Sequence, residues 1–175
     1  MEIGDDSVTK QEIGRGKGIV GLSRCFKRVL FDIGGRQKRV VFVGSESTCL
    51  PIAELLAYAG REMDHSWYFI PNGRKRDARR LEFKPGYGFQ LGDEKFSGKA
   101  GIVVLLGGLA MPSSRVNSVE IGRLVSEILD RDGKVVGVGF MGIFERSGWV
   151  GKVRFDYLMD VLIESVKVDK FASTQ

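Results

Sequence analysis

The sequence predicts an α/β fold, a three-layer sandwich with a mostly parallel, Rossmann-like or flavodoxin-like sheet of four to six strands. Short apolar, β-branched runs alternate along the chain with stretches in which apolar residues recur every three or four positions. The first pattern is typical of buried strands and the second of amphipathic helices, and their alternation favours parallel strands joined by helices. With 175 residues, 43% of them apolar, the chain has the size and composition of one globular domain.

The first element is an amphipathic helix over residues 19–33. Its apolar side chains recur at three- and four-residue intervals with basic residues between them, and a Gly-Gly pair ends the pattern. We expect the apolar stripe to pack on the body of the domain, with binding to a membrane or a partner as the alternative. Residues 1–18 are expected to form a mobile tail and residues 19–175 a single α/β domain.

The remaining elements follow the same two patterns. Four apolar runs predict the principal strands, over residues 39–43, 67–70, 102–106 and 134–140. Two alternating runs around a Pro-Gly pair predict a hairpin, over residues 81–83 and 87–91. Helical stripes predict three further helices, over residues 51–63, from an N-cap at Asn117 to Gly133, and over residues 155–166. Residues 143–150 are expected to form a loop.

Two turns carry the candidate ligand site. In open α/β sheets, ligands bind beyond the carboxyl ends of the strands, where the strand order reverses. If the order of the principal strands is 2-1-3-4, the turns at residues 44–51 and 107–114 flank that point. Both contain glycine and hydroxyl side chains, and the helix after the first offers free N–H groups to a phosphate or carboxylate. The candidate ligand-binding residues, including two on the edge of the site, are Gly44, Ser45, Ser47, Thr48, Cys49, Asn72, Arg74, Gly107, Gly108, Ser113 and Ser114.

The first turn also has a purely structural explanation. Thr48 is expected to be the N-cap of the following helix, so the hydroxyls would only satisfy the turn, and Glu46 counts against a strongly anionic ligand. Cys49 is the weak catalytic candidate, because a helix N-terminus lowers the pKa of a thiol. The single histidine, His65, is expected at the opposite end of the sheet, so an inert, buried thiol is the alternative. Whether the protein is an enzyme stays open.

No cofactor can be named from the sequence. Gly137-x-Gly139-x-x-Gly142 matches the dinucleotide-binding pattern, but it ends the last predicted strand instead of the first. Glycines that permit close packing are the alternative. The sequence contains neither the P-loop pattern nor the ligand spacing of a zinc site, so no metal is predicted.

The net charge of +5 is concentrated in two segments, since residues 10–39 carry +7 and residues 74–80 carry +4. Such segments attract small anions, nucleic acid or an acidic partner. A nucleic-acid interface, the alternative to a small-molecule site, would combine the first helix with Arg74, Lys75, Arg76, Arg79 and Arg80. A solvated basic turn explains the second segment equally well. A non-catalytic scaffold subunit is a third alternative, suggested only by the apolar face of the first helix.

Several motifs resemble a small uncharacterised family of α/β proteins from methanogenic archaea. They are Val43-Gly44-Ser45, Cys49-Leu50-Pro51, Ala53-Glu54-Leu55-Leu56 and Gly107-Gly108-Leu109-Ala110-Met111-Pro112. The resemblance spans roughly residues 20–168 and implies a cytoplasmic archaeal protein without an assigned activity. The two cysteines and the acidic start, which lacks the pattern of an export signal, also favour the cytoplasm over export or a membrane. A homodimer stays open.

Overall fold

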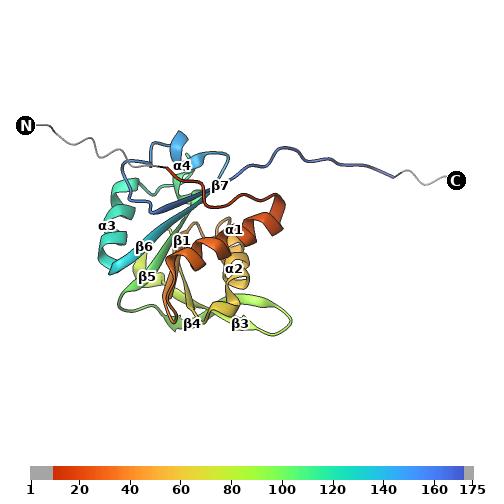
Figure 1. Ribbon diagram of the computed structural model, residues 1–175. Coiled ribbons are helices and arrows are strands. Elements are labelled where there is room, and N and C mark those ends of the chain that lie inside the picture. The colour runs from red at the N-terminus through yellow and green to blue at the C-terminus, as the bar shows by residue number, and fades with distance from the viewer. Residues whose placement is uncertain (1–9, 172–175) are drawn as a thin grey trace, which may run out of the picture.

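The computed structural model describes residues 10–171 and contains one seven-stranded sheet in the order β4-β3-β2-β1-β5-β6-β7 (Figure 1). The strands are β1 (Arg39–Gly44), β2 (Ser66–Pro71), β3 (Arg79–Lys84), β4 (Gly88–Lys95), β5 (Ala100–Leu106), β6 (Leu129–Phe140) and β7 (Tyr157–Val161). The helices are α1 (Gly18–Ile33), α2 (Leu50–Ala59), α3 (Ser118–Ile128) and α4 (Ile143–Arg146). Three 3-10 turns connect them, η1 (Arg61–Met63), η2 (Lys75–Asp77) and η3 (Gly107–Ala110).

The sheet is mostly parallel, which confirms the predicted α/β class. β1 pairs in parallel with β2 and β5, and β6 pairs in parallel with β5 and β7. β3 is antiparallel to both of its neighbours, β2 and β4, and together β3 and β4 extend the sheet beyond β2 as the predicted hairpin. The four principal strands therefore have the 2-1-3-4 order on which the predicted site depends. The seven strands exceed the predicted four to six.

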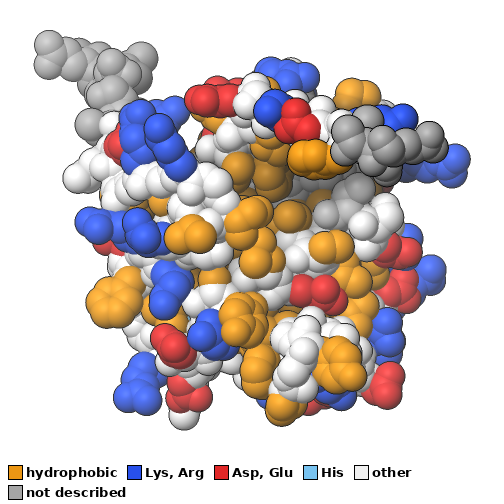
Figure 2. Space-filling model, turned by 90° about the vertical axis from the view of Figure 1, so that its right-hand side faces the viewer, with side chains coloured by type: hydrophobic (Ala, Val, Ile, Leu, Met, Phe, Trp, Pro, Cys, Tyr) orange, Lys and Arg blue, Asp and Glu red, His pale blue; other side chains and the backbone are white. Residues whose placement is uncertain are grey.

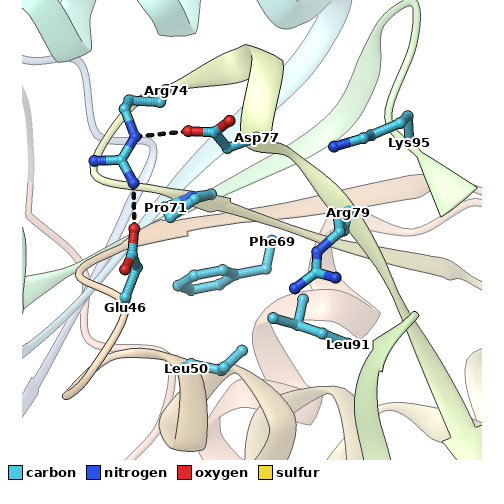
Figure 3. Close-up of a pocket in the computed structure, with 9 residues that line it drawn as sticks. All are labelled: Glu46, Leu50, Phe69, Pro71, Arg74, Asp77, Arg79, Leu91 and Lys95. Atoms are coloured by element: carbon cyan, nitrogen blue, oxygen red, sulfur yellow. Dashed lines mark hydrogen bonds and ion pairs between the residues drawn. The ribbon is translucent and has the colours of Figure 1, made fainter. Parts of the chain in front are cut away.

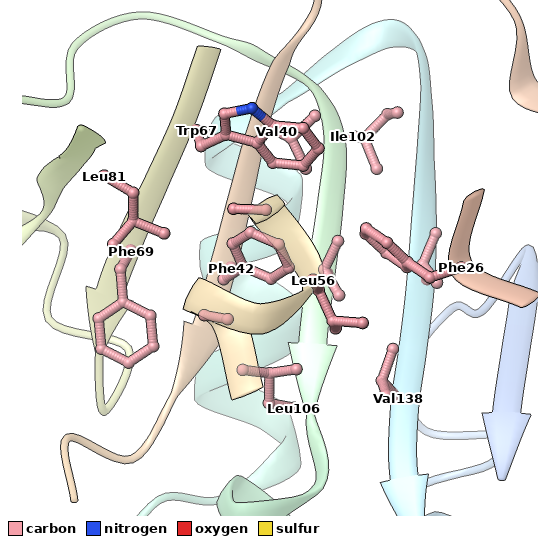
Figure 4. Close-up of a cluster of buried hydrophobic side chains, with 14 of the residues drawn as sticks. Phe26, Val40, Phe42, Leu56, Trp67, Phe69, Leu81, Ile102, Leu106 and Val138 are labelled. Carbon is pink, nitrogen blue, oxygen red and sulfur yellow. The ribbon is translucent and has the colours of Figure 1, made fainter. Parts of the chain in front are cut away.

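Apolar side chains cover both faces of the central strand. Alternate residues of a strand point to opposite faces, so Val40 and Phe42 of β1 pack toward α1 and α2, while Val41 and Val43 belong to a second cluster with α3. On the first face, Phe42 stacks on Trp67 with ring centroids 5.9 Å apart (Figure 4). Because β1 offers no polar side chain after Arg39, polar groups available to a ligand lie beyond the carboxyl end of the strand.

Helix α1 packs on the body of the domain, as predicted. Phe26 and Leu30 are fully buried, and the hydroxyl of Tyr157 on β7 donates to Asp32 at 2.9 Å. Of the predicted tail 1–18, residues 1–9 lie outside the described residues. Residues 10–17 form no regular element, although Ile13 packs against the core.

Helix α2 is apolar on nearly all sides, with Glu54 as its one charged residue. Its inner side buries Ala53 and Leu56, and Tyr58 on its outer side stacks on Phe83 of β3 with ring centroids 6.3 Å apart. Figure 2 shows apolar side chains gathered on the face of the molecule that lies on the right in Figure 1. Part of the apolar surface of the domain therefore remains exposed to solvent.

The prediction of a helix over residues 155–166 is wrong. Residues 157–161 form β7, which pairs with β6 from Val136 to Phe140. Tyr157, Met159 and Val161 alternate toward the α1 side of the sheet. The segment contains apolar residues at both a helical and a two-residue period, and the open edge of β6 favours the second.

The ends of three other predicted elements also differ. Helix α3 ends at Ile128, and Gly133 lies within β6 instead of ending the helix. Helix α2 ends at Ala59 and is followed by the separate turn η1, so the predicted helix over residues 51–63 is interrupted at Gly60. The predicted loop over residues 143–150 contains the short helix α4. For α2 and α3, the local pattern located the helix but not its end.

Removing the cap of α3 should destabilise the fold. The side chain of Asn117 accepts the backbone N–H of Glu120 at 2.9 Å, which confirms the predicted N-cap. We expect Asn117→Ala to lower the free energy of unfolding by about 0.5–2 kcal/mol, because that N–H loses its partner. Urea denaturation measures the change, and Asn117→Asp, which retains an acceptor oxygen, is the matched control. Equal losses in both variants would exclude the cap as the cause.

Candidate functional site

The turns after β1 and β5 touch each other, as the pairing of these strands requires. The hydroxyls of Ser45 and Thr48 are hydrogen-bonded at 2.6 Å, and Ser45 donates to the thiol of Cys49 at 3.2 Å. Gly108 packs directly on this group, and a Cβ there would overlap Sγ of Cys49 and lie 2.8 Å from Oγ of Ser45. Gly107 is equally close to β6, with a built Cβ 3.0 Å from Cα of Gly139. The space between the two turns is thus filled by their own atoms.

The prediction that Thr48 caps α2 is wrong. The helix begins at Leu50, its N-cap position is Cys49, and no side chain caps it. The backbone N–H of Cys49 donates to the carbonyl of Ser45 at 3.1 Å, so the turn already has helical geometry before α2 starts. Gly44 permits this geometry, since a Cβ at Gly44 would overlap Cβ of Cys49. Ser47 is exposed.

Cys49 and His65 lie at opposite ends of the sheet. The Cys49 side chain is buried, with 4% of its surface exposed, directly after the carboxyl end of β1. His65 precedes β2, and its Nδ1 accepts the backbone N–H of Lys38, just before β1, at 3.3 Å. The histidine cannot act as a base for the thiol at this separation, so the geometry favours the packing role of Cys49.

The loop after β2 is held against the turn after β1. Asn72 has a left-handed backbone conformation (φ 49°), and its N–H donates to the carbonyl of Gly44 at 2.8 Å. Arg74 pairs with Glu46 of the neighbouring turn and donates to Asp77 at 2.7 Å. The hydrogen bonds that Arg74 donates to Asp77 and Glu46 raise the pKa of Arg74, and the hydrogen bond from Arg74 lowers the pKa of Asp77. Glu46 therefore pairs with a cation, although its side chain is exposed.

The structure does not place Ser113 and Ser114, the two serines of the turn after β5, beside the loop after β2. Ser114 accepts the backbone N–H of Val116 at 3.3 Å and so stabilises its own loop. Ser113 is exposed beyond η3. Of the candidate residues, the structure thus brings together those at 44–49 with Gly108, and separately Asn72 and Arg74 with the first turn.

A hollow of about 430 Å³ lies on the β2 side of the first turn (Figure 3). We call it the strand-end hollow. Its lining residues come from the first turn, α2, β2, η2, β3 and β4, and they are Glu46, Leu50, Phe69, Pro71, Arg74, Asp77, Arg79, Leu91 and Lys95. Arg74 is the one lining residue that was predicted to contact a small ligand. Arg79 was predicted only as a contact to nucleic acid. Leu91 and Lys95 were not predicted, because their position beside the hollow depends on the antiparallel pairing of β4 with β3.

The strand-end hollow combines an apolar base with cations. Leu50 and Leu91 supply apolar surface above the buried Phe69, and Arg79 extends beside them. Arg79 lies opposite Phe69 in the sheet and so on the same face, with Asp93 3.8 Å from its guanidinium. Among residues 10–171, no carboxylate lies within 4.0 Å of the ammonium of Lys95. An anion can therefore meet positive charge at the Arg79–Lys95 side of the hollow.

The basic segment 74–80 is not an uncompensated positive patch. Each of its five cations lies within 4 Å of a carboxylate, and the partners are Glu46, Asp77, Asp93, Glu94 and Glu127. Lys75 reaches α3 through Glu127, whereas Arg79 and Arg80 project to opposite faces of β3. This arrangement offers no continuous row of cations to a phosphate backbone.

The part of the chain that the structure describes contains no helix long and apolar enough to span a membrane.

Replacing Gly108 should force the two turns apart. We expect Gly108→Ala to lower the free energy of unfolding by about 1–3 kcal/mol, because its Cβ would displace Cys49 and Ser45. Gly122→Ala is the matched control, since the position on α3 has open space and alanine there should stabilise by roughly 0.5–1 kcal/mol. Urea denaturation compares them. A neutral Gly108→Ala would show that the turns are not in contact.

The titration of His65 offers a second test of the fold. Burial lowers the pKa of His65, and the charge of Lys38 lowers it further. Between the unfolded value of about 6.5 and the lower folded value, only the unfolded chain takes up the proton, so stability falls as the pH drops through that range. The chain has one histidine, so proton NMR gives its pKa without ambiguity. A value at or above 6.5 would contradict the burial.

Comparisons with known proteins agree with the fold and the sequence motifs. A family model described as an uncharacterised protein conserved in archaea (DUF2124) matches residues 17–164. An uncharacterised protein of Methanocaldococcus jannaschii is 37% identical over 159 residues, which cover 91% of this chain and 94% of that protein. An uncharacterised protein of Methanothermobacter thermautotrophicus is 37% identical over 127 residues, covering 73% and 80%.

A solved structure is similar as well. The crystal structure of a protein of unknown function from Methanothermobacter thermautotrophicus matches with a TM-score of 0.82 at 30% identity, over 93% of this chain and 99% of that one. The resemblance inferred from the turn motifs is therefore confirmed, and the chain belongs to the DUF2124 family of uncharacterised archaeal proteins.

Proposed function

We propose that the protein binds a small anionic molecule with an apolar or aromatic part in the strand-end hollow. The observation that carries this proposal is the presence of Arg79 and Lys95 beside the apolar side chains of Phe69 and Leu91. The hollow lies beyond the carboxyl end of β2, and open α/β sheets bind ligands outside the carboxyl ends of their strands. It lies on the β2 flank and not at the switch point between β1 and β5, which the turns fill. No reaction is proposed.

Charge supports an anionic ligand. Glu46 and Asp77 already compensate Arg74, so this arginine contributes little free positive charge. Lys95 and the weakly paired Arg79 carry the remaining positive charge of the hollow. A phosphate or carboxylate placed between these two side chains would gain charge-assisted hydrogen bonds.

Size and polarity support a ligand larger than a bare anion. A volume of about 430 Å³ lies within the range of small-molecule sites, which are mostly apolar with a few polar groups that fix orientation. Leu50 and Leu91 supply the apolar part, with the buried Phe69 beneath them. A nucleoside monophosphate has the matching chemistry, with a flat base for the apolar surface and a phosphate for the cations.

The proposed site is displaced from the one that the sequence favoured. Ser45 and Thr48 are bonded to each other beneath Gly108, so their hydroxyls are committed to the turn. The hollow opens on the other flank of that turn, where Glu46 and Arg74 join it to the loop after β2.

AMP is a suitable probe, and Lys95 is the residue to change. We expect AMP to raise the melting temperature and Lys95→Ala to weaken AMP binding about tenfold, because one charge-assisted contact is lost. Isothermal titration calorimetry measures the dissociation constant. Lys84→Ala is the matched control, since it removes the same charge at the far end of β3, where Lys84 pairs with Glu82.

Two simpler probes separate the parts of the ligand. Inorganic phosphate and adenosine should each bind more weakly than AMP, since each uses one half of the hollow. Equal effects of Lys95→Ala and Lys84→Ala would indicate non-specific charge attraction. If none of the three probes shifts the melting temperature, a mononucleotide-like ligand is excluded.

A further inference from the structure

The chain after β7 exposes an unusual series of apolar side chains. Residues 162–171 extend away from the body without forming a regular element (Figure 1). The exposed fractions of their large apolar side chains are 65% for Leu162, 54% for Ile163, 84% for Val166, 88% for Val168 and 93% for Phe171. Apolar and charged residues alternate from 166 to 169, which is typical of a half-buried strand. The segment has part of the pattern of a strand, but no strand among residues 10–171 pairs with it.

The strand that precedes this segment has an open edge. β7 pairs with β6 on one side and is the last strand of the sheet. An edge strand presents unpaired N–H and C=O groups that can pair with another chain. Residues 157–171 contain no proline and no glycine, so β7 and the following segment can form one longer strand.

We propose that residues 159–171 pair with the same residues of a second copy, antiparallel about a two-fold axis, so that two sheets join into one. A two-fold axis between adjacent antiparallel strands is perpendicular to the sheet, so each face of one copy continues into the same face of the other. Side chains that lie opposite each other must therefore share a face, and one residue on the axis lies opposite itself.

The charges select one register. With Ser165 on the axis, Asp160 lies opposite Lys170, Leu162 opposite Val168, and Met159 opposite Phe171. Opposite charges and apolar pairs across strands stabilise a sheet, whereas like charges destabilise it.

The neighbouring registers are less complementary. An axis at Glu164 or Lys167 would place that charge opposite its own copy. An axis at Val166 would remove every pairing of opposite charges among residues 160–171. Among axes at residues 163–167, Ser165 is the position that brings opposite charges together without a like-charged pair.

The interface is independent of the proposed ligand site. β7 forms one edge of the sheet, and the strand-end hollow lies beside β3 and β4 at the other edge. Failure of ligand binding would therefore not contradict the dimer. A monomeric protein would likewise not contradict ligand binding.

A cysteine at Ser165 tests the axis directly. Opposite residues of antiparallel strands have Cα atoms about 4.5–5.5 Å apart, which is within reach of a disulfide. We expect Ser165→Cys in the full chain to form a covalent dimer on oxidation with copper phenanthroline, visible on a non-reducing gel. Lys167→Cys is the matched control, because its two copies would be separated by roughly 14 Å, four residues along the strand. Both variants retain Cys25 and Cys49.

Light scattering of the full chain tests the pairing without oxidation. We expect a dimer whose dissociation constant rises roughly three- to tenfold in Lys170→Glu, which places like charges opposite Asp160. Lys167→Glu makes the same change in charge opposite Ile163 and should change the constant less than twofold. A monomer at micromolar concentrations, equal effects of the two substitutions, or equal cross-linking of the two cysteine variants would overturn the proposal.

Discussion

Because β1 is buried on both faces, the position of any ligand site depends on how the chain turns beyond the ends of the central strands. The turn after β1 is closed on one side by Gly108, which fits against Ser45 and Cys49 only because it lacks a side chain. On the other side, the ion pair between Glu46 and Arg74 holds the loop after β2. Gly108 thus leaves no space between the turns after β1 and β5, and the strand-end hollow lies on the β2 side of the first turn.

The fold was predictable where local pattern and tertiary environment agree. The buried runs that became β1, β2 and β5 are apolar on both faces, and Asn117 caps α3 as its position before a helical stripe suggests. The failure at residues 155–166 has a clear physical cause. Phe155, Leu158 and Leu162 fit a helical stripe, whereas Tyr157, Met159 and Val161 fit a strand, and only the free edge of β6 decides between them.

The candidate site was predictable in part, for a similar reason. The rule for strand ends located the turn after β1 and the loop with Asn72 and Arg74, and the structure joins these two segments. Leu91 and Lys95 could not be placed beforehand, because their position depends on the register of an antiparallel hairpin that bulges near Arg79.

The charge of the surface formed by residues 74–80 could also not be predicted from the sequence alone. Residues 74–80 carry +4 in the sequence, but their carboxylate partners come from distant positions such as Glu46, Glu94 and Glu127. A count of charges along the chain therefore overstated the positive potential of this surface. In the strand-end hollow, Lys95 has no carboxylate within 4.0 Å among residues 10–171. It lies beside apolar side chains and suits a small ligand better than a nucleic acid.

The position of the ligand site is tested most directly by an NMR titration of isotope-labelled protein with AMP. Binding in the strand-end hollow predicts that the amide resonances of Arg79, Leu91 and Lys95 shift with a common dissociation constant, while those of Gly108 and Ser113 stay unchanged. Shifts confined to residues 107–114 would place the ligand between the turns of β1 and β5 and contradict the proposed site.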